Sequence, residues 1–312
     1  MSSYMNDTLS NSVPQIFDDR VLHLKRRRAS RHFDEYRFLF DQVSDSLSDR
    51  MLDIKREFET GLIFGANRLS ARAQERIKKH GKFDNLFQTD FLDLQPKYGD
   101  GINLIAQEEL LPLGRQKLDF IGSFLSLHTA NDLPGALIQI KYALKPDGLF
   151  LGCLFGGETL YEMRQVLMES ESRVLGGVSP RVMPFADKQQ MGALLQRAGF
   201  ALPVVDSDVL EVTYPDIYAL MRDIRGMGET NIVKERSRQN PGKALFEKAN
   251  DLYKQLYSDE QGRLIARFEI IYLIGWAPHE SQQKPLRPGS AENSLAHALD
   301  TQEYDTDVPT GK

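Results

Sequence analysis

Two side chains in this sequence are suited to proton transfer or charge stabilisation at the ends of predicted strands. His128 lies among apolar residues in SFLSLHTAN, and an unperturbed imidazole titrates near neutrality. It is a candidate general base, with a structural histidine beside a strand end as the alternative. Glu158 follows the glycine pair of FGGET. It would orient a cationic substrate group, or it would favour the start of a helix.

A second set of residues could bind a nucleotide-type ligand. Gly65 and Asn67 follow the first predicted strand in FGAN, where positive φ angles would bring the main chain close to a ligand. An ordinary strand-to-helix turn is the alternative. Asp90 follows the second strand, ~20–25 residues later, a spacing that suits binding of ribose hydroxyls; a helix N-cap is the alternative. Gln107 follows the third strand and would contact an adenine amine or lie in solvent. Ser123, at the end of the fourth strand, completes this set.

These candidates need a framework that brings strand ends together. From residue 60, short apolar runs alternate with helical segments, which is typical of βαβ units around a parallel sheet. We predict strands at 61–64, 85–89, 102–106, 118–124, 149–155, 203–214 and 268–277. The helix over 132–144 has Asp132 as its N-cap, and Gly199 ends the helix over 188–198. Ligands bind beyond the carboxyl ends of such strands, so all the candidates fall near one edge.

The composition limits the class of protein. The 312 residues are 41% hydrophobic and 27% charged, with a net charge of −5, which argues against a nucleic-acid partner. The one cysteine, Cys153, excludes a disulfide framework and a Cys-rich zinc site, and no spacing indicates another metal. No apolar run has the ~20 residues of a membrane span. Without a secretory signal, and with Asp7 and Asp18 interrupting any transit peptide, we predict a cytoplasmic bacterial protein. The oligomeric state is left open.

The pattern divides the chain into six segments. A disordered N-terminus (1–15) and a helical extension (16–57) precede a core (58–214). A helical insertion that would act as a lid (215–262), the last core strand (263–280) and a disordered tail (281–312) follow. The basic run Lys25–Arg28 is either a solvated helix face or a docking patch for an acidic partner. The turn GMGETN in the insertion either closes over the site or only joins two helices.

Several longer segments resemble a known family. They are SFLSLHTANDLPGAL, LKPDGLFLG, FGGETLYEMR, SPRVMPF, GMGETN and IYLIGW, within residues 16–282. With them the sequence resembles class I S-adenosylmethionine (AdoMet) methyltransferases of the malonyl-carrier-protein group. It is more similar still to the complex I assembly factors with a methyltransferase domain and their bacterial relatives. The resemblance implies an α/β, Rossmann-like, seven-stranded sheet that binds AdoMet through Gly65, Asn67, Asp90, Gln107 and Ser123.

The family's glycine-rich cofactor loop falls on LIFGANRL, which keeps Leu62 and Gly65. Its ribose-binding acid falls on Asp90, and its adenine-side acid on Gln107, an amide. The resemblance implies a methyltransferase-like protein that acts on a protein substrate, a respiratory complex subunit, in complex I assembly. An arginine hydroxylase on the same fold and a non-catalytic assembly module with a degenerate pocket are the alternatives.

Overall fold

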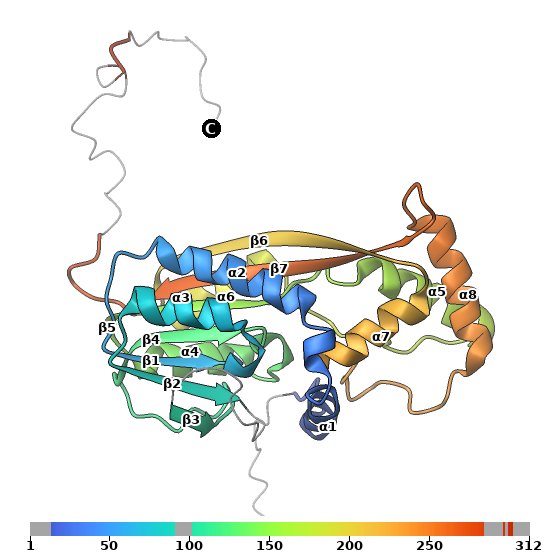
Figure 1. The fold of residues 1–312 in the computed structure, drawn as a ribbon, viewed down its shortest axis with the longest axis horizontal. Helices are drawn as coiled ribbons and strands as arrows, with labels where there is room; N and C mark the ends of the chain where they lie inside the picture. The colour runs from blue at the N-terminus through green and yellow to red at the C-terminus, as the bar shows by residue number, and fades with distance from the viewer. Residues whose placement is uncertain (1–13, 91–101, 284–295, 297–298, 302–312) are drawn as a thin grey trace, which may run out of the picture. The chain divides into compact units, whose positions relative to one another are not determined.

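The computed structural model of the protein describes residues 14–90, 102–283, 296 and 299–301 (Figure 1). The chain divides into two units, residues 1–278 and residues 279–312. The first contains the sheet and its helices. In the second, the ring of His279 lies 2.7 Å from the hydroxyl of Ser281. The predicted terminal segments 1–15 and 281–312 lie mostly outside the described residues, so their disorder stays a prediction.

A seven-stranded sheet in the order β3-β2-β1-β4-β5-β7-β6 forms the centre of the first unit's described part (Figure 1). β1 to β5 run parallel, and β7 is antiparallel to both β5 and β6. The predicted Rossmann-like α/β sheet is thus confirmed. The strands are β1 Thr60–Phe64, β2 Asn85–Asp90, β3 Ile102–Ile105, β4 Leu118–Phe124, β5 Leu144–Phe155, β6 Ala201–Tyr214 and β7 Leu264–Trp276.

The fifth strand begins well before its predicted start at residue 149. The sequence places a tight turn at residues 146–148 before the fifth strand, but β5 already begins at Leu144, which pairs with Leu118. The register then shifts before Phe120 pairs with Leu149, and Asp147 has a φ of +61°. The turn is therefore an irregularity inside the strand, because residues on both sides of it pair with β4.

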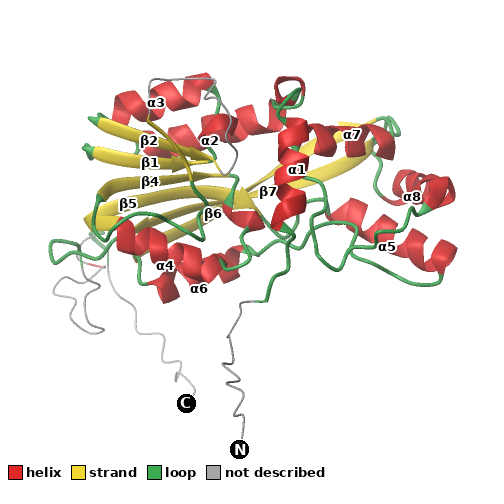
Figure 2. Cartoon of the chain, turned by 90° about the horizontal axis from the view of Figure 1, so that it is seen from below, coloured by secondary structure: helices red, strands yellow, loops and turns green. Residues whose placement is uncertain are grey.

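Two pairs of helices cover the two faces of the sheet (Figure 2). Alternation along β1 explains the two layers, because Ile63 belongs to one apolar cluster while Leu62 and Phe64 belong to the other. Asp132 caps the first turn of α4 by accepting the Gly135 N–H at 2.9 Å, as predicted. One face carries α2 Phe38–Leu52 and α3 Ala71–Gly81, and the other carries α4 Leu133–Ala143 and α6 Lys188–Ala198.

The N-terminal extension differs from the prediction in which face it buries. Its first helix, α1 Asp19–Ala29, is shorter than the periodicity indicates and is followed by a 3₁₀ turn, η1 Phe33–Glu35. Within the basic run Lys25–Arg28, predicted to be a solvated face or a docking patch, Arg26 is buried, whereas the neighbouring Leu24 is exposed. Phe17 forms an isolated bridge with Val233, which fixes the chain just before the helix and therefore the face it turns inward.

The segment predicted as a lid contains two helices, α7 Ile217–Met227 and α8 Gly242–Leu256, between the last two strands. α8 packs against α5 Tyr161–Leu175, and α7 packs against α1 (Figure 1). Gly228, with a φ of +80°, ends α7. No described helix is both apolar enough and long enough to cross a membrane.

Candidate functional site

The carboxyl ends of β1, β2 and β4 lie side by side. Phe64, the last residue of β1, pairs with Thr89 on one side and with Ser123 on the other. The Gly65 N–H donates to the Thr89 carbonyl at 2.9 Å. The strand order reverses direction between β1 and β4, where doubly wound sheets bind their ligands. Gly65, Asp90 and Ser123 therefore lie along the edge at which a cofactor is expected.

The turn after β1 has one left-handed residue. Gly65 has a φ of +69°, and a Cβ there would lie 2.3 Å from the carbonyl oxygen of Phe124. The prediction of a left-handed conformation at Asn67 is wrong, because Asn67 lies in the 3₁₀ turn Ala66–Arg68 and has a negative φ. Leu69 is extended, with a φ of −64°, and fully buried. The backbone of Leu69 is therefore unstrained, and its side chain adds to the core.

The other predicted cofactor-binding residues differ in how far the structure describes their side chains and in what those side chains contact. Asp90 ends β2 next to Ile105, but its side chain lies outside the described residues. Gln107 is half-buried, and its amide nitrogen lies 3.1 Å from a ring nitrogen of His23. The Ser123 hydroxyl is buried and forms a 2.9 Å hydrogen bond with the Ser126 hydroxyl. The roles of these residues in cofactor binding stay predictions.

A buried cluster of charged and titratable side chains lies beside this edge. The Glu229 carboxylate accepts hydrogen bonds from Arg26 at 3.0 Å and from Arg68 at 2.9 Å through one oxygen. Its other oxygen lies 2.9 Å from Nε2 of His128. The four side chains come from α1, from the turns after β1 and β4, and from the segment after α7. We call these four residues the Glu229 cluster.

Burial and charge together set the protonation of the Glu229 cluster. Burial alone would raise the pKa of Glu229, but Arg26, Arg68 and the hydrogen bond with His128 lower it well below its ordinary value. Burial lowers the pKa of His128; Glu229 opposes this, while Arg26 and Arg68 add to it. At neutral pH Glu229 is therefore a carboxylate and His128 a neutral imidazole.

These charges also fix the tautomer of His128. An ionised carboxylate only accepts hydrogen bonds, so Nε2 must carry the proton that it donates to Glu229. Nδ1 then carries the lone pair, and it has no hydrogen-bond partner among the described residues. The ring packs against Phe155 and Phe185, with centroids 4.9 Å and 6.0 Å away. An oriented neutral imidazole with a free lone pair has the chemistry of a general base.

A second carboxyl group, that of Glu108, interacts electrostatically with the same two arginines. Glu108 is half-buried, and desolvation raises its pKa against a hydrogen bond with Ser126 and the charges of Arg26 and Arg68. Glu109, the next residue, accepts a hydrogen bond from the main-chain N–H of Asp132. Both carboxyl groups therefore contact protein rather than solvent alone.

Glu158 lies away from the Glu229 cluster. Its side chain is exposed, and its main-chain N–H donates to Glu269 at 2.9 Å. Glu269, on β7, is the buried acid of this region; its carboxylate also lies against Gly156. The orienting role predicted for Glu158 stays a prediction, and the structure gives its side chain no buried partner among the described residues.

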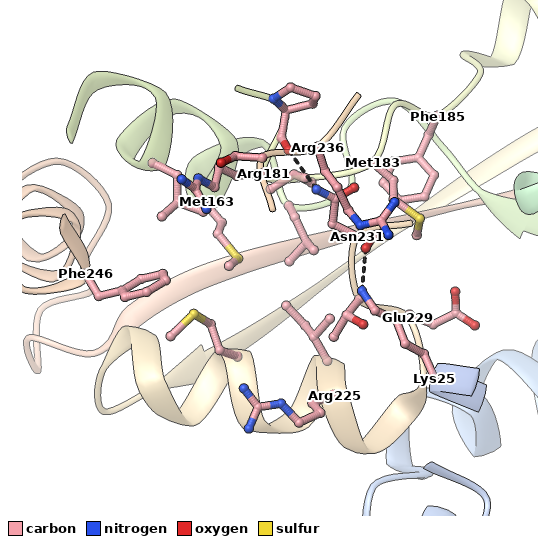
Figure 3. Close-up of a pocket in the computed structure, with 18 residues that line it drawn as sticks. Lys25, Met163, Arg181, Met183, Phe185, Arg225, Glu229, Asn231, Arg236 and Phe246 are labelled. Carbon is pink, nitrogen blue, oxygen red and sulfur yellow. Dashed lines mark hydrogen bonds between the residues drawn. The ribbon is translucent and has the colours of Figure 1, made fainter. Parts of the chain in front are cut away.

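A cavity of about 360 Å³ lies next to the Glu229 cluster (Figure 3). Glu229 and Phe185 both line it, and both contact His128. Its walls come from α1, α5, α7, the segment after α7, α8 and residues 180–185. Among the described residues, no group of three His, Cys, Asp or Glu side chains is placed to hold a metal ion.

Sequence reasoning missed three of the four members of the Glu229 cluster. Glu229 lies in GMGETN, which the sequence marked as a turn that could close over the site. Arg26 lies in the basic run predicted to be a solvated face or a docking patch, and Arg68 lies in the cofactor-loop segment. The one sequence feature that could have indicated these buried charges is the presence of charged residues in segments that also contain apolar residues. Nothing in their spacing indicated that they would pair.

Comparison with curated proteins gives matches along nearly the whole chain. The arginine-hydroxylase NDUFAF5, mitochondrial, of Mus musculus is 39% identical over 90% of this chain and 82% of its own. The protein of that name from Homo sapiens is 38% identical with the same coverage. The malonyl-[acyl-carrier protein] O-methyltransferase of Xylella fastidiosa (strain M23) is 36% identical over 54% of this chain and 55% of its own. No family model matches the chain.

Solved structures share the fold at low sequence identity. The YcgJ protein of Bacillus subtilis superposes with a TM-score of 0.50 at 14% identity, covering 75% of this chain and 99% of its own. A Bacillus halodurans protein assigned to the methyltransferases gives a TM-score of 0.52 at 11% identity, covering 76% and 99%. These likenesses support the methyltransferase fold alone.

The matches correct one prediction. The sequence indicated a cytoplasmic bacterial protein, because no transit peptide was recognisable. The relatives that match most of the chain are mitochondrial proteins of eukaryotes, so that assignment is contradicted. The reasoning failed because composition near one terminus carries little information about the compartment of a protein.

Proposed function

Because this chain belongs to the methyltransferase-like family that includes the mitochondrial arginine-hydroxylase NDUFAF5, we propose that it modifies a protein side chain during assembly of respiratory complex I. The observation that supports a catalytic role most directly is the buried pair of His128 and Glu229. It lies at the carboxyl ends of β1 and β4, where this fold binds its ligands. A side chain held in one tautomer by a buried carboxylate is preorganised for proton transfer.

The cofactor in this proposal is AdoMet, which supplies an electrophilic methyl group when bound. The residues that would hold it are Gly65, Asp90, Gln107 and Ser123. The turn at Gly65 supports such a site through its position, because it follows the carboxyl end of β1, where this fold binds its ligands. In the described conformation Gln107 and Ser123 contact other side chains, so they would exchange these partners for the ligand.

The target residue in this proposal is arginine. The relatives named arginine-hydroxylases match almost the whole chain, including α7 and the segment with Glu229, whereas the malonyl-carrier-protein methyltransferases match about half. As a guanidinium nitrogen gains the methyl group, Nδ1 of His128 would take the proton that this nitrogen loses, and Glu229 would stabilise the imidazolium that forms. Segment 215–262 would act as the lid, because it carries Glu229 to the site.

Two reactions at arginine remain to be distinguished, and mass spectrometry separates them. Purified protein is incubated with arginine-containing peptides of complex I subunits, with AdoMet and, separately, with an oxidant. Methylation adds a CH₂ unit to the peptide and hydroxylation adds one oxygen atom. His128→Gln retains an N–H donor for Glu229 but has no basic lone pair, so we expect the rate to fall by ~10²–10⁴. An unchanged rate in a folded His128→Gln protein would contradict the assignment of the base.

Cofactor binding is tested without any substrate. A ligand at ~100 times its dissociation constant stabilises the folded state by ~2.7 kcal/mol, so AdoMet should raise the melting temperature by several degrees. Asp90→Ala should abolish this shift. Asp84→Ala, an exposed carboxylate just before the same strand, is the matched control and should keep it. Folded protein that gives no shift at saturating AdoMet would favour the non-catalytic assembly module.

A further inference from the structure

We propose that the cavity beside the Glu229 cluster binds an anionic group carried on an apolar stem. The proposal does not rest on the proposed function, because such a ligand would bind there whether or not the chain is an enzyme. Two features of the described lining carry it. The walls are mostly apolar, and the charged residues on them are mostly basic.

The apolar walls suit a flexible stem. Met163 and Phe246 lie at one end of the cavity in Figure 3, and Lys25 and Glu229 lie at the other. Methionine side chains adapt to ligands of different shape. A volume of about 360 Å³ lies within the range of small-molecule sites. The apolar lining includes Leu160, Met163, Leu167, Met183, Phe185 and Met221.

The charges around the cavity do not balance. Lys25, Arg181, Arg225 and Arg236 line it, and Glu229 is the one carboxylate among its described lining residues. The Glu229 charge is already shared by the two arginines of the Glu229 cluster. The cavity therefore has a positive excess that an anion would neutralise.

Two of these four cations have partners outside the cavity. Arg181 forms an ion pair with Glu171 at 2.6 Å, and Arg236 forms one with Asp18 at 3.3 Å. Arg225, on the exposed side of α7, has no ion-pair partner within the described part of the chain.

Lys25 also lacks a compensating carboxylate. Within the described residues it donates to the main-chain oxygen of Asn231 and forms no ion pair with a carboxylate. Burial lowers the pKa of Lys25 to about 8, and repulsion from Arg236 and Arg225 adds to this against the opposing charge of Asp18. Lys25 and Arg225 are thus the cations free to bind a ligand anion. Their excess charge would repel an arginine side chain, so the cavity would hold a different group from the target proposed above.

Octanoate is the probe, and titration calorimetry without AdoMet or protein substrate is the measurement. Octanol and octylamine have the same stem with no charge and with the opposite charge. We expect octanoate to bind at least ~10-fold more tightly than octanol, the factor that ~1.4 kcal/mol represents. Octylamine should bind more weakly than octanol. Binding of octanol as tight as that of octanoate, or no binding of octanoate, would overturn the proposal.

Three variants assign the binding to the cavity. Arg225→Met and Lys25→Met each remove one free cation and should weaken octanoate about tenfold. Arg222→Met removes the same charge from an exposed position on the same helix that does not line the cavity, and it should leave binding unchanged. Equal weakening by Arg222→Met and Arg225→Met would mean that only the overall charge matters, which sinks the proposed site.

The same measurement distinguishes two sources of the ligand. A short peptide with glutamate between leucine and phenylalanine presents the anion as a protein side chain, whereas octanoate presents it as a free amphiphile. Whichever binds more tightly, with sensitivity to Arg225→Met, identifies the source. If neither octanoate nor the peptide binds, the AdoMet-binding and peptide-modification assays can still succeed. The cavity proposal and the proposed function are therefore tested independently.

Discussion

Replacing Glu229 with alanine is expected to lower the free energy of unfolding by about 3–5 kcal/mol, because it leaves buried arginines without their shared carboxylate. Arg26 and Arg68 are both buried and both donate to the same oxygen of Glu229. His128 would lose the acceptor that fixes its tautomer. Urea unfolding monitored by circular dichroism measures the change in stability.

Glu229→Gln separates charge from shape. The amide oxygen can still accept from one arginine, so we expect a smaller loss than with alanine. Glu247→Gln is the control, since Glu247 forms only an exposed helical pair with Lys243 and its loss should leave stability unchanged. A loss with Glu229→Ala no larger than with Glu247→Gln would mean that the Glu229 cluster contributes nothing to the fold.

The pH dependence of the Glu229 contribution has a definite sign. The folded-state pKa lies below the ordinary value of 4.5, so the unfolded chain binds a proton here more readily than the folded chain. The contribution is therefore present above that ordinary value and is lost as the pH falls below it. The wild-type protein should lose more stability than Glu229→Gln on acidification in this range. Equal acid sensitivity would contradict the lowered pKa.

Replacing Gly65 with alanine is expected to cost about 2–5 kcal/mol of stability and to abolish AdoMet binding. The left-handed conformation costs a non-glycine residue ~1–2 kcal/mol. The new methyl group would also lie 2.3 Å from the carbonyl oxygen of Phe124, and relieving such overpacking typically costs ~1–3 kcal/mol. Because that oxygen belongs to β4, its displacement would move the strand ends on which the site depends.

Gly176→Ala isolates the first of these two effects, the cost of the left-handed conformation. Gly176 has a φ of +70°, almost that of Gly65, but a Cβ there would meet no atom within 4 Å. It should therefore lose only the conformational part, about 1–2 kcal/mol, and keep AdoMet binding. Equal losses in the two variants would show that the contact with Phe124 relaxes without cost.

The Glu229 cluster connects the fold to the proposed chemistry. It joins α1, two strand-end turns and the segment after α7, and the same carboxylate orients His128. Main-chain contacts reinforce this junction, because the Asp18 N–H donates to the Ile232 carbonyl at 2.9 Å. The packing of the N-terminal extension against the insertion therefore also holds Glu229 where it orients His128, the candidate base.

The sequence by itself determined the features that depend on neighbouring residues. Short apolar runs between turn signals predicted all seven strands of the described sheet, and only the ends moved. Asp132 and Gly199 marked helix ends correctly, because caps are formed by residues a few positions away. Segments that resemble the methyltransferase family, such as FGGETLYEMR, predicted the topology of the sheet, because homologous chains keep their topology.

The tertiary structure decided which charges are buried and paired. Arg26 and Glu229 are 203 residues apart. No pattern in the residues next to either one predicts that their side chains form an ion pair. A basic residue on a short helix is solvated unless another segment covers it. Here the bridge of Phe17 with Val233 turns α1 so that Arg26 faces inward and Leu24 faces out. Ion pairs between distant segments depend on this docking, which local patterns do not encode.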